Sequence, residues 1–292
     1  MTGNVYDALT EDSDDPRWAF GSGFDEVEAD LTAPVPGGAD PADLAAYCLM
    51  LGDDALLVSH RLTEWVSNAP ELEEEVALAN TALDLLGQAR VLLARAGHLL
   101  GTDEDALAYR RDGSGFRCVA LAEPSDDLDF ARCIARLLVF SSWRLALLHR
   151  LQASADPVLA AVAAKGVKEV TYHRDHAARW TLRLGDGTPV SHTRMQDALE
   201  RVWPFLDELF RTSAVERRLV DAGVAVDPAT TRDEVHTVLD QVLARATLTR
   251  PDVPPMGTVG GRGGRDGLHT EHLEPALAVL QSLARRHPGA TW

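Results

Sequence analysis

Apolar residues recur at three- and four-residue steps along most of the chain after residue 40, and this periodicity predicts amphipathic helices. Asp40 is suited to an N-cap and Pro41 to a first helical turn, so the first helix is predicted over about 40–67. The pair Ala69-Pro70 then interrupts the pattern. A second helix is predicted over 71–100, and because it is apolar almost all round, we expect it at the centre of the protein.

Two more long helices are predicted over about 127–153 and 157–184, with a short helix over about 102–111 before them. Four long segments joined mostly by short turns predict an antiparallel four-helix bundle, so the expected fold class is all-α. The bundle should span about 40–190, and residues 191–292 should add C-terminal helices. These further helices are expected over about 191–211, 213–222, 231–247 and 270–286.

Residues 1–38 lack this periodicity and end in a Pro- and Gly-rich stretch, which predicts a flexible acidic extension before a helical domain over 39–292. The extension holds nine acidic residues against Arg17 alone, and the whole chain has a formal net charge of −17. An acidic chain of this kind binds nucleic acid poorly, because the phosphate backbone repels it. We therefore expect no nucleic-acid partner.

No apolar run approaches the roughly 20 residues that a membrane span needs, and no basic start followed by an apolar stretch indicates a secretory signal. The three cysteines, Cys48, Cys118 and Cys133, form no CxxC pair, and their number is odd. Reduced thiols in the cytoplasm are the simplest interpretation. The sequence thus predicts a cytoplasmic protein that does not bind membranes.

Long four-helix bundles often hold a carboxylate-bridged di-iron site, which needs a Glu from each of two helices and a Glu-x-x-His pair from each of the other two. The helices of this chain do not supply that set. Asp84 has no histidine three residues on, and no carboxylate lies between Phe130 and Ala155. The nearest histidine after Glu169 is His173, one position too far along. We therefore expect no metal in this chain, and no other local motif points to a cofactor or a catalytic residue.

Polar residues nevertheless occupy positions near the centre of the predicted bundle. Because buried charges must be paired, we expect a salt-bridge network in place of a metal, and we favour it over a relic acid–base site. Lys168 is predicted to be the cation, although adjacent helix residues point about 100° apart, so that Lys168 facing solvent stays the alternative. The predicted members are Asp53, Asp54, Asp84, Lys168, Glu169 and His173.

A glycine-rich loop, Gly260-Gly-Arg-Gly-Gly264, resembles a phosphate-binding loop in composition. No predicted strand precedes it, so a nucleotide site is disfavoured. Its arginines could meet an anionic cofactor tail or an acidic partner.

Ordered blocks of residues across about 40–292 resemble the PaaC family, which comprises subunits of the ring 1,2-phenylacetyl-CoA epoxidases. Residues 1–38 lie outside the shared pattern. The blocks are LGDDALLVSHRLTEW (51–65), APELEEEVALAN (69–80), DLLGQAR (84–90), KEVTYH (168–173), WTLRLGDGT (180–188), GGRDGLHTEHL (263–273) and PGATW (288–292).

This resemblance implies a ferritin-like fold and a structural, non-catalytic subunit of the multicomponent phenylacetyl-CoA epoxidase, an NADPH-dependent monooxygenase of aerobic phenylacetate catabolism. It implies a heteromeric complex with a sister subunit that carries the di-iron centre, a small bridging subunit, and a reductase with FAD and an iron–sulfur centre. Two other interpretations stay open. One is a helical binding or scaffold protein unrelated to an oxygenase, and the other is a self-sufficient di-metal oxidase with an unusual ligand set.

Overall fold

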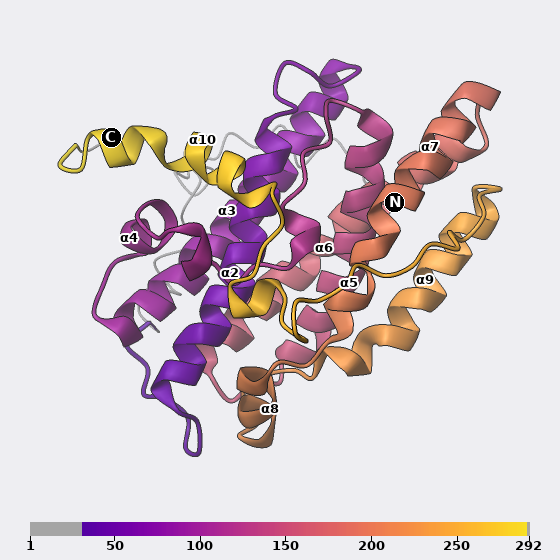
Figure 1. The fold of residues 1–292 in the computed structure, drawn as a ribbon. Helices are drawn as coiled ribbons and strands as arrows, with labels where there is room; N and C mark the ends of the chain where they lie inside the picture. The colour runs from indigo at the N-terminus through magenta and orange to yellow at the C-terminus, as the bar shows by residue number, and fades with distance from the viewer. Residues whose placement is uncertain (1–30, 291–292) are drawn as a thin grey trace, which may run out of the picture.

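Four long helices form the body of the protein, and their bounds agree with the sequence prediction to within a few residues. The computed structural model describes residues 31–290, and over that range the chain is all-α, as predicted. Helix α2 packs along α3, α3 along α6, and α6 along α5, which joins the four into one helical bundle (Figure 1). The four helices are α2 (Pro41–Thr63), α3 (Leu72–Leu100), α5 (Phe130–Leu151) and α6 (Pro157–Gly185).

Shorter helices surround this bundle, and most of them come from the C-terminal part of the chain. Helices α7 and α9 both pack on α5 and α6, α8 packs on α2, and α10 packs on α4, which itself lies against α3. Figure 1 shows α9 and α10 on opposite sides of the bundle. Their bounds are α4 (Glu104–Tyr109), α7 (Pro189–Val202), α8 (Ala214–Asp221), α9 (Arg232–Arg245) and α10 (Leu273–Arg286).

Local capping chemistry sets where the long helices begin and end. The Asp40 carboxylate accepts hydrogen bonds from the first backbone N–H groups of α2, and Asp156 does the same at the start of α6. A proline follows each cap in the first turn, where its missing N–H costs nothing. Helix α3 ends at Gly101, whose φ of 72° is the left-handed conformation that glycine adopts without strain.

The central helix is α5, and the prediction that residues 71–100 lie at the centre is wrong. Nearly every residue of α5 is buried, because α6, α7 and α9 all pack around it. Helix α3 instead leaves one apolar face uncovered: Leu72 is 70% exposed, Val76 52% and Leu83 38%. These residues recur at helical spacing and so lie along one side of α3. Apolar character alone did not distinguish a helix surrounded by its own bundle from one with a free apolar side.

Helix α3 is also long and apolar enough, by length and composition, to cross a membrane, although 44% of the relevant window is buried inside the protein. Its place in the bundle, between α2 and α6, accounts for that burial. Three consecutive acids, Glu73 to Glu75, occupy its first turn. A core helix passes the same test, so this finding is weak support for a membrane span.

A fully buried ion pair joins α3 to the start of α6. Arg95 Nη2 lies 2.7 Å from Asp156 Oδ2, and both side chains have no solvent exposure. The second guanidinium nitrogen, Nη1, donates to the carbonyl oxygens of Leu31 and Ala33. These two residues belong to the end of the predicted extension, so its last part lies against the helical domain. The prediction for residues 1–30 falls outside the residues that the structure describes.

Asp156 serves both as this ion-pair partner and as the α6 cap, and two substitutions separate these roles. Asp156→Asn keeps an oxygen that can cap the helix but leaves Arg95 buried without a counter-charge, so we expect a loss of about 3–5 kcal/mol of unfolding free energy. Asp156→Ala also removes the cap, which should cost about 1 kcal/mol more. Urea denaturation of the two variants and the parent chain measures both values. Equal stability of parent and Asp156→Asn would contradict the assigned ion pair.

Candidate functional site: the charged centre of the bundle

Two adjacent carboxylates on α2, Asp53 and Asp54, lie in the centre of the protein with no solvent exposure. Neighbouring helix residues point in different directions, so each carboxylate meets its own partner. Arg111, in the loop after α4, places Nη2 2.5 Å from Asp53 Oδ1 and Nη1 3.0 Å from Oδ2. The backbone N–H of Arg117 adds a third hydrogen bond to Asp53, at 2.8 Å. Asp53 therefore forms a bidentate ion pair with the Arg111 guanidinium.

Asp54 is matched in the same way by Arg265, which comes from the segment just before α10. Arg265 Nη2 lies 2.8 Å from Asp54 Oδ2 and Nη1 lies 3.0 Å from Oδ1, while the N–H of Val119 donates to Oδ1 at 2.8 Å. Arg265 Nη1 also donates to the carbonyl oxygens of Met50 and Arg117. The segment that carries Arg265 lies across α2 in Figure 1, where it is drawn in yellow.

A third arginine, Arg144 on α5, begins a hydrogen-bonded line that runs to α6. Its Nε donates to Gln88 Oε1 at 3.0 Å, and the Gln88 amide nitrogen donates to Glu169 Oε2 at 2.8 Å. Arg144 also donates to the carbonyl oxygen of Leu51 at 3.3 Å. Glu169 is half-buried and faces Lys165 one turn earlier, at 3.7 Å. One amide side chain thus connects a buried cation to a carboxylate near the surface.

The remaining predicted residues lie at the α3–α6 contact. His173 is buried, and its Nε2 lies 3.0 Å from Asp84 Oδ2, whose side chain is 38% exposed. Lys168 is exposed, so the prediction that it supplies the central cation is corrected. The physical reason is the one named as the alternative: Lys168 precedes Glu169 by a single residue and therefore points away from the face that Glu169 shares with Gln88.

Burial and ion pairing act in opposite directions on the acidities of these groups. Burial raises the pKa of Asp53 above its usual range, while the Arg111 guanidinium opposes that rise. Burial raises the pKa of Glu169 as well, against the hydrogen bond from Gln88. The pKa of Arg144 falls to about 10, because its guanidinium is buried and the positive charge of Arg265 lies nearby. Burial also disfavours the charged form of Arg265, but the carboxylates of Asp54, Glu216 and Glu208 together outweigh it and raise the pKa of that guanidinium.

This arrangement has consequences for metal binding. Each of Asp53 and Asp54 accepts three hydrogen bonds, two from a guanidinium and one from a backbone N–H. A metal ion would have to displace an arginine from each carboxylate and would then face that positive charge at close range. Helix α5 offers Arg144, and no carboxylate, toward this centre. The donor set suits a closed charge network and does not suit a di-iron centre.

Five of the six predicted residues thus form two groups rather than one cluster, and the exposed Lys168 belongs to neither. Asp53 and Asp54 belong to the buried centre, whereas Asp84, Glu169 and His173 lie along the α3–α6 contact. Sequence reasoning missed the arginines that neutralise the centre. One signal was present: the sequence left open that arginines at the glycine-rich loop meet an anionic cofactor tail or an acidic partner. For Arg265 that anion is a carboxylate of its own chain, not a cofactor tail.

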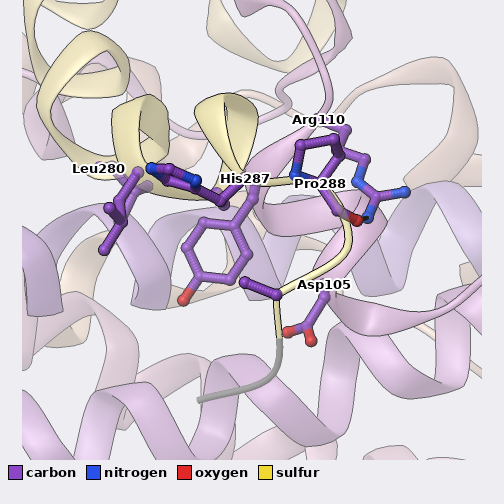
Figure 2. A pocket seen from close by; sticks show the side chains of 9 residues that line it. Asp105, Arg110, Leu280, His287 and Pro288 are labelled. Carbon is purple, nitrogen blue, oxygen red and sulfur yellow. Dashed lines mark hydrogen bonds between the residues drawn. The ribbon is translucent and has the colours of Figure 1, made fainter.

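A separate pocket of about 390 Å³ lies between α4 and α10, away from the charged centre. Figure 2 shows Arg110 and Pro288 on one side of it and Leu280 on the other, with Asp105 below. None of the six predicted residues lines this pocket, and Arg110 already donates to the carbonyl oxygen of Pro288 at 3.2 Å. The pocket is therefore separate from the charged centre.

Known proteins match this chain over most of its length. The family described as phenylacetic acid catabolic protein matches residues 35–292. In addition, 250 residues of the chain are 45% identical to the C subunit of 1,2-phenylacetyl-CoA epoxidase from Escherichia coli strain K12. That alignment covers 85% of this chain and 99% of the relative. The family match contains every described helix and both arginine–carboxylate pairs.

The pairing of Asp54 with Arg265 predicts a specific pattern of stability. Arg265→Met leaves a buried carboxylate unpaired, so the free energy of unfolding should fall by about 3–5 kcal/mol. Adding Asp54→Asn should restore much of this loss, because it removes the orphaned charge. The exposed Lys168→Met serves as control and should change stability by less than about 0.5 kcal/mol. Urea denaturation provides the measurement, and a Lys168→Met loss as large as that of Arg265→Met would contradict the assignment.

Proposed function

Because the chain belongs to the phenylacetic acid catabolic protein family, we propose that it is the structural subunit of a 1,2-phenylacetyl-CoA epoxidase in aerobic phenylacetate catabolism. Support comes from 45% identity to one subunit of such an epoxidase over 99% of that relative's length. The relative is named as one of several subunits, so this chain too should act within a complex. We propose that this complex is located in the cytoplasm.

We further propose that the chain contributes no catalytic group of its own. The observation that carries this proposal is the saturation of Asp53 and Asp54 by Arg111 and Arg265. An oxygen-activating di-iron site needs carboxylate oxygens that are free to bind metal. In this chain those oxygens are committed to guanidinium groups, so the oxygen chemistry belongs to a sister subunit that carries the di-iron centre. A small bridging subunit and a reductase with FAD, an iron–sulfur centre and NADPH complete the proposed complex.

The free apolar face of α3 is the proposed contact for the sister subunit. Leu72, Val76 and Leu83 run along one side of a helix of 29 residues, and none of the three is buried by the described part of the chain. An exposed apolar stripe of this kind marks a protein–protein contact when the protein works in a complex. A sister subunit with a similar bundle could present a helix of matching length to it.

The two other interpretations have less support. A self-sufficient di-metal oxidase would need free carboxylates where this chain has closed ion pairs. A scaffold protein unrelated to oxygenases would not account for 45% identity across almost the whole of an epoxidase subunit.

The absence of a di-iron centre from this chain can be tested by metal analysis. Purified alone from iron-supplemented cells, the chain should retain far less than one iron per molecule, because its central carboxylates are held by arginines. Purified with the sister subunit, the complex should contain about two irons per pair. A content of about two irons in the isolated chain would refute the non-catalytic role.

The α3 contact predicts that a charge on its exposed apolar face prevents assembly. Val76→Arg or Leu83→Arg would bury an unpaired charge in the interface, so affinity for the sister subunit should fall at least about 100-fold, or about 2.8 kcal/mol. The matched control is Val259→Arg, since Val259 is 74% exposed but lies far from α3 in the chain. Co-purification from cells expressing the subunits together, followed by titration, measures the effect.

Both α3 variants should keep the thermal stability of the parent chain, since the substituted side chains are exposed in it. Full assembly of both α3 variants with the sister subunit would exclude this face as the contact.

A further inference from the structure

A cysteine, a glutamate and a histidine converge beside the charged centre, outside the residues already discussed. Cys118 and Glu123 lie in the stretch between α4 and α5, and His269 lies in the C-terminal segment just before α10. His269 Nδ1 is 2.7 Å from Glu123 Oε1, and Cys118 Sγ is 3.8 Å from Nδ1 and 4.0 Å from Oε1. Cys118 and Glu123 are fully buried, and the His269 side chain is 7% exposed.

These three groups do not form a nucleophile with its base. In a catalytic triad the histidine uses one ring nitrogen for the nucleophile and the other for the carboxylate. Here Cys118 and Glu123 both face Nδ1, while Nε2 lies 3.1 Å from the carbonyl oxygen of Phe116. Burial raises the pKa of the Cys118 thiol well above its ordinary value, and no substrate could reach a fully buried sulfur.

The hydrogen bond at Nε2 of His269 determines whether Nδ1 carries a proton in the neutral ring. The Phe116 carbonyl can only accept, so Nε2 must carry a proton and donate it. In a neutral imidazole Nδ1 then presents a lone pair, and that lone pair points at an oxygen of Glu123. Two lone pairs at 2.7 Å repel each other unless a cation lies between them. The cation is either a proton or a metal ion, and the nearby thiol suits a metal ion.

The surroundings of these ligands also match those of protein metal sites. A metal-binding histidine usually donates its second ring N–H to a carbonyl or carboxylate, as His269 does to Phe116. A metal-binding carboxylate is usually held by hydrogen bonds of its own. Glu123 Oε2 accepts two, from the backbone N–H of Thr270 at 2.7 Å and from its hydroxyl at 2.6 Å. Glu123 Oε1 thus stays directed toward Nδ1 and the sulfur.

We propose that Cys118 Sγ, Glu123 Oε1 and His269 Nδ1 bind one Zn²⁺ ion. Zinc accepts sulfur, nitrogen and oxygen ligands together, and at its usual bond lengths these ligand atoms lie about 3.3–3.6 Å apart. The three separations here, 2.7, 3.8 and 4.0 Å, bracket that range, so small side-chain shifts would bring these three atoms around the ion and leave the fourth tetrahedral position to a water molecule. A thiolate and a carboxylate balance the ion's two charges, which lowers the cost of burying it.

The zinc ion would have a structural role. It would join the stretch before α5 to the C-terminal segment at a point four residues after Arg265, the partner of Asp54. The ion would therefore hold the segment that neutralises the centre of the bundle. This proposal departs from the sequence-based expectation of no metal in this chain, and it is independent of the proposed role in an epoxidase.

Direct metal binding by the full chain tests the proposal. After desalting, the chain should retain about one zinc, and Co²⁺ substituted for it should give the intense near-ultraviolet absorption of thiolate bound to cobalt. Cys118→Ala should lose that absorption. Its zinc affinity should also fall by more than roughly 10–100-fold, which is the loss expected when only a hydrogen-bond partner of a ligand is removed. The matched control is Cys48→Ala, another buried free cysteine, which should keep both properties.

Two results would overturn the zinc site. One is failure of the parent chain to show thiolate absorption with Co²⁺, whether Co²⁺ binds elsewhere or neither metal binds. In that case a proton would lie between His269 and Glu123. The other is equal zinc affinity of Cys118→Ala and Cys48→Ala. The cobalt spectrum of the parent chain keeps the test decisive even if a variant fails to fold.

Discussion

Two adjacent carboxylates buried on one helix, Asp53 and Asp54, impose the constraint on which the rest of the structure depends. Leaving either one unpaired would cost several kcal/mol, so each needs a cation at hydrogen-bonding distance. Both cations are arginines, and both come from outside the four long helices: Arg111 from the loop after α4 and Arg265 from the segment before α10. The C-terminal part of the chain therefore completes the centre of the bundle and is not an appendage to it.

The same constraint connects the fold to the proposed role. Carboxylates in bidentate ion pairs with arginines are not available as metal ligands. A bundle of the kind that often holds a di-iron centre here holds ion pairs at its centre instead. In the proposed non-catalytic role the chain acts through contacts, and α3 offers an apolar face that the described part of the chain leaves uncovered. The segment that supplies Arg265 also supplies His269, so one stretch of chain carries both the central cation and the proposed zinc ligand.

Two interpretations from the sequence needed correction, and both depended on direction in space. Helix 71–100 was expected at the centre because it is apolar almost all round, yet α5 occupies that place and α3 keeps an exposed face. Lys168 was expected to neutralise the centre because it adjoins Glu169, yet it points to solvent. Apolar composition does not reveal whether the covering surface belongs to the same chain, and adjacency along a helix does not place two side chains on one face.

The sequence by itself determined the four long helices, their approximate ends and the family, because periodicity, caps and ordered blocks are local properties that can be read over short windows. It also showed that the four long helices hold no Glu-x-x-His pair of the kind that di-iron bundles use, since that pair is a spacing within single helices. Tertiary structure alone decided which charges meet. Asp54 and Arg265 stand 211 residues apart, and the ligand atoms of Cys118 and His269 meet across 151 residues. Such contacts depend on how the C-terminal segment folds across α2, and no short window of sequence contains that information.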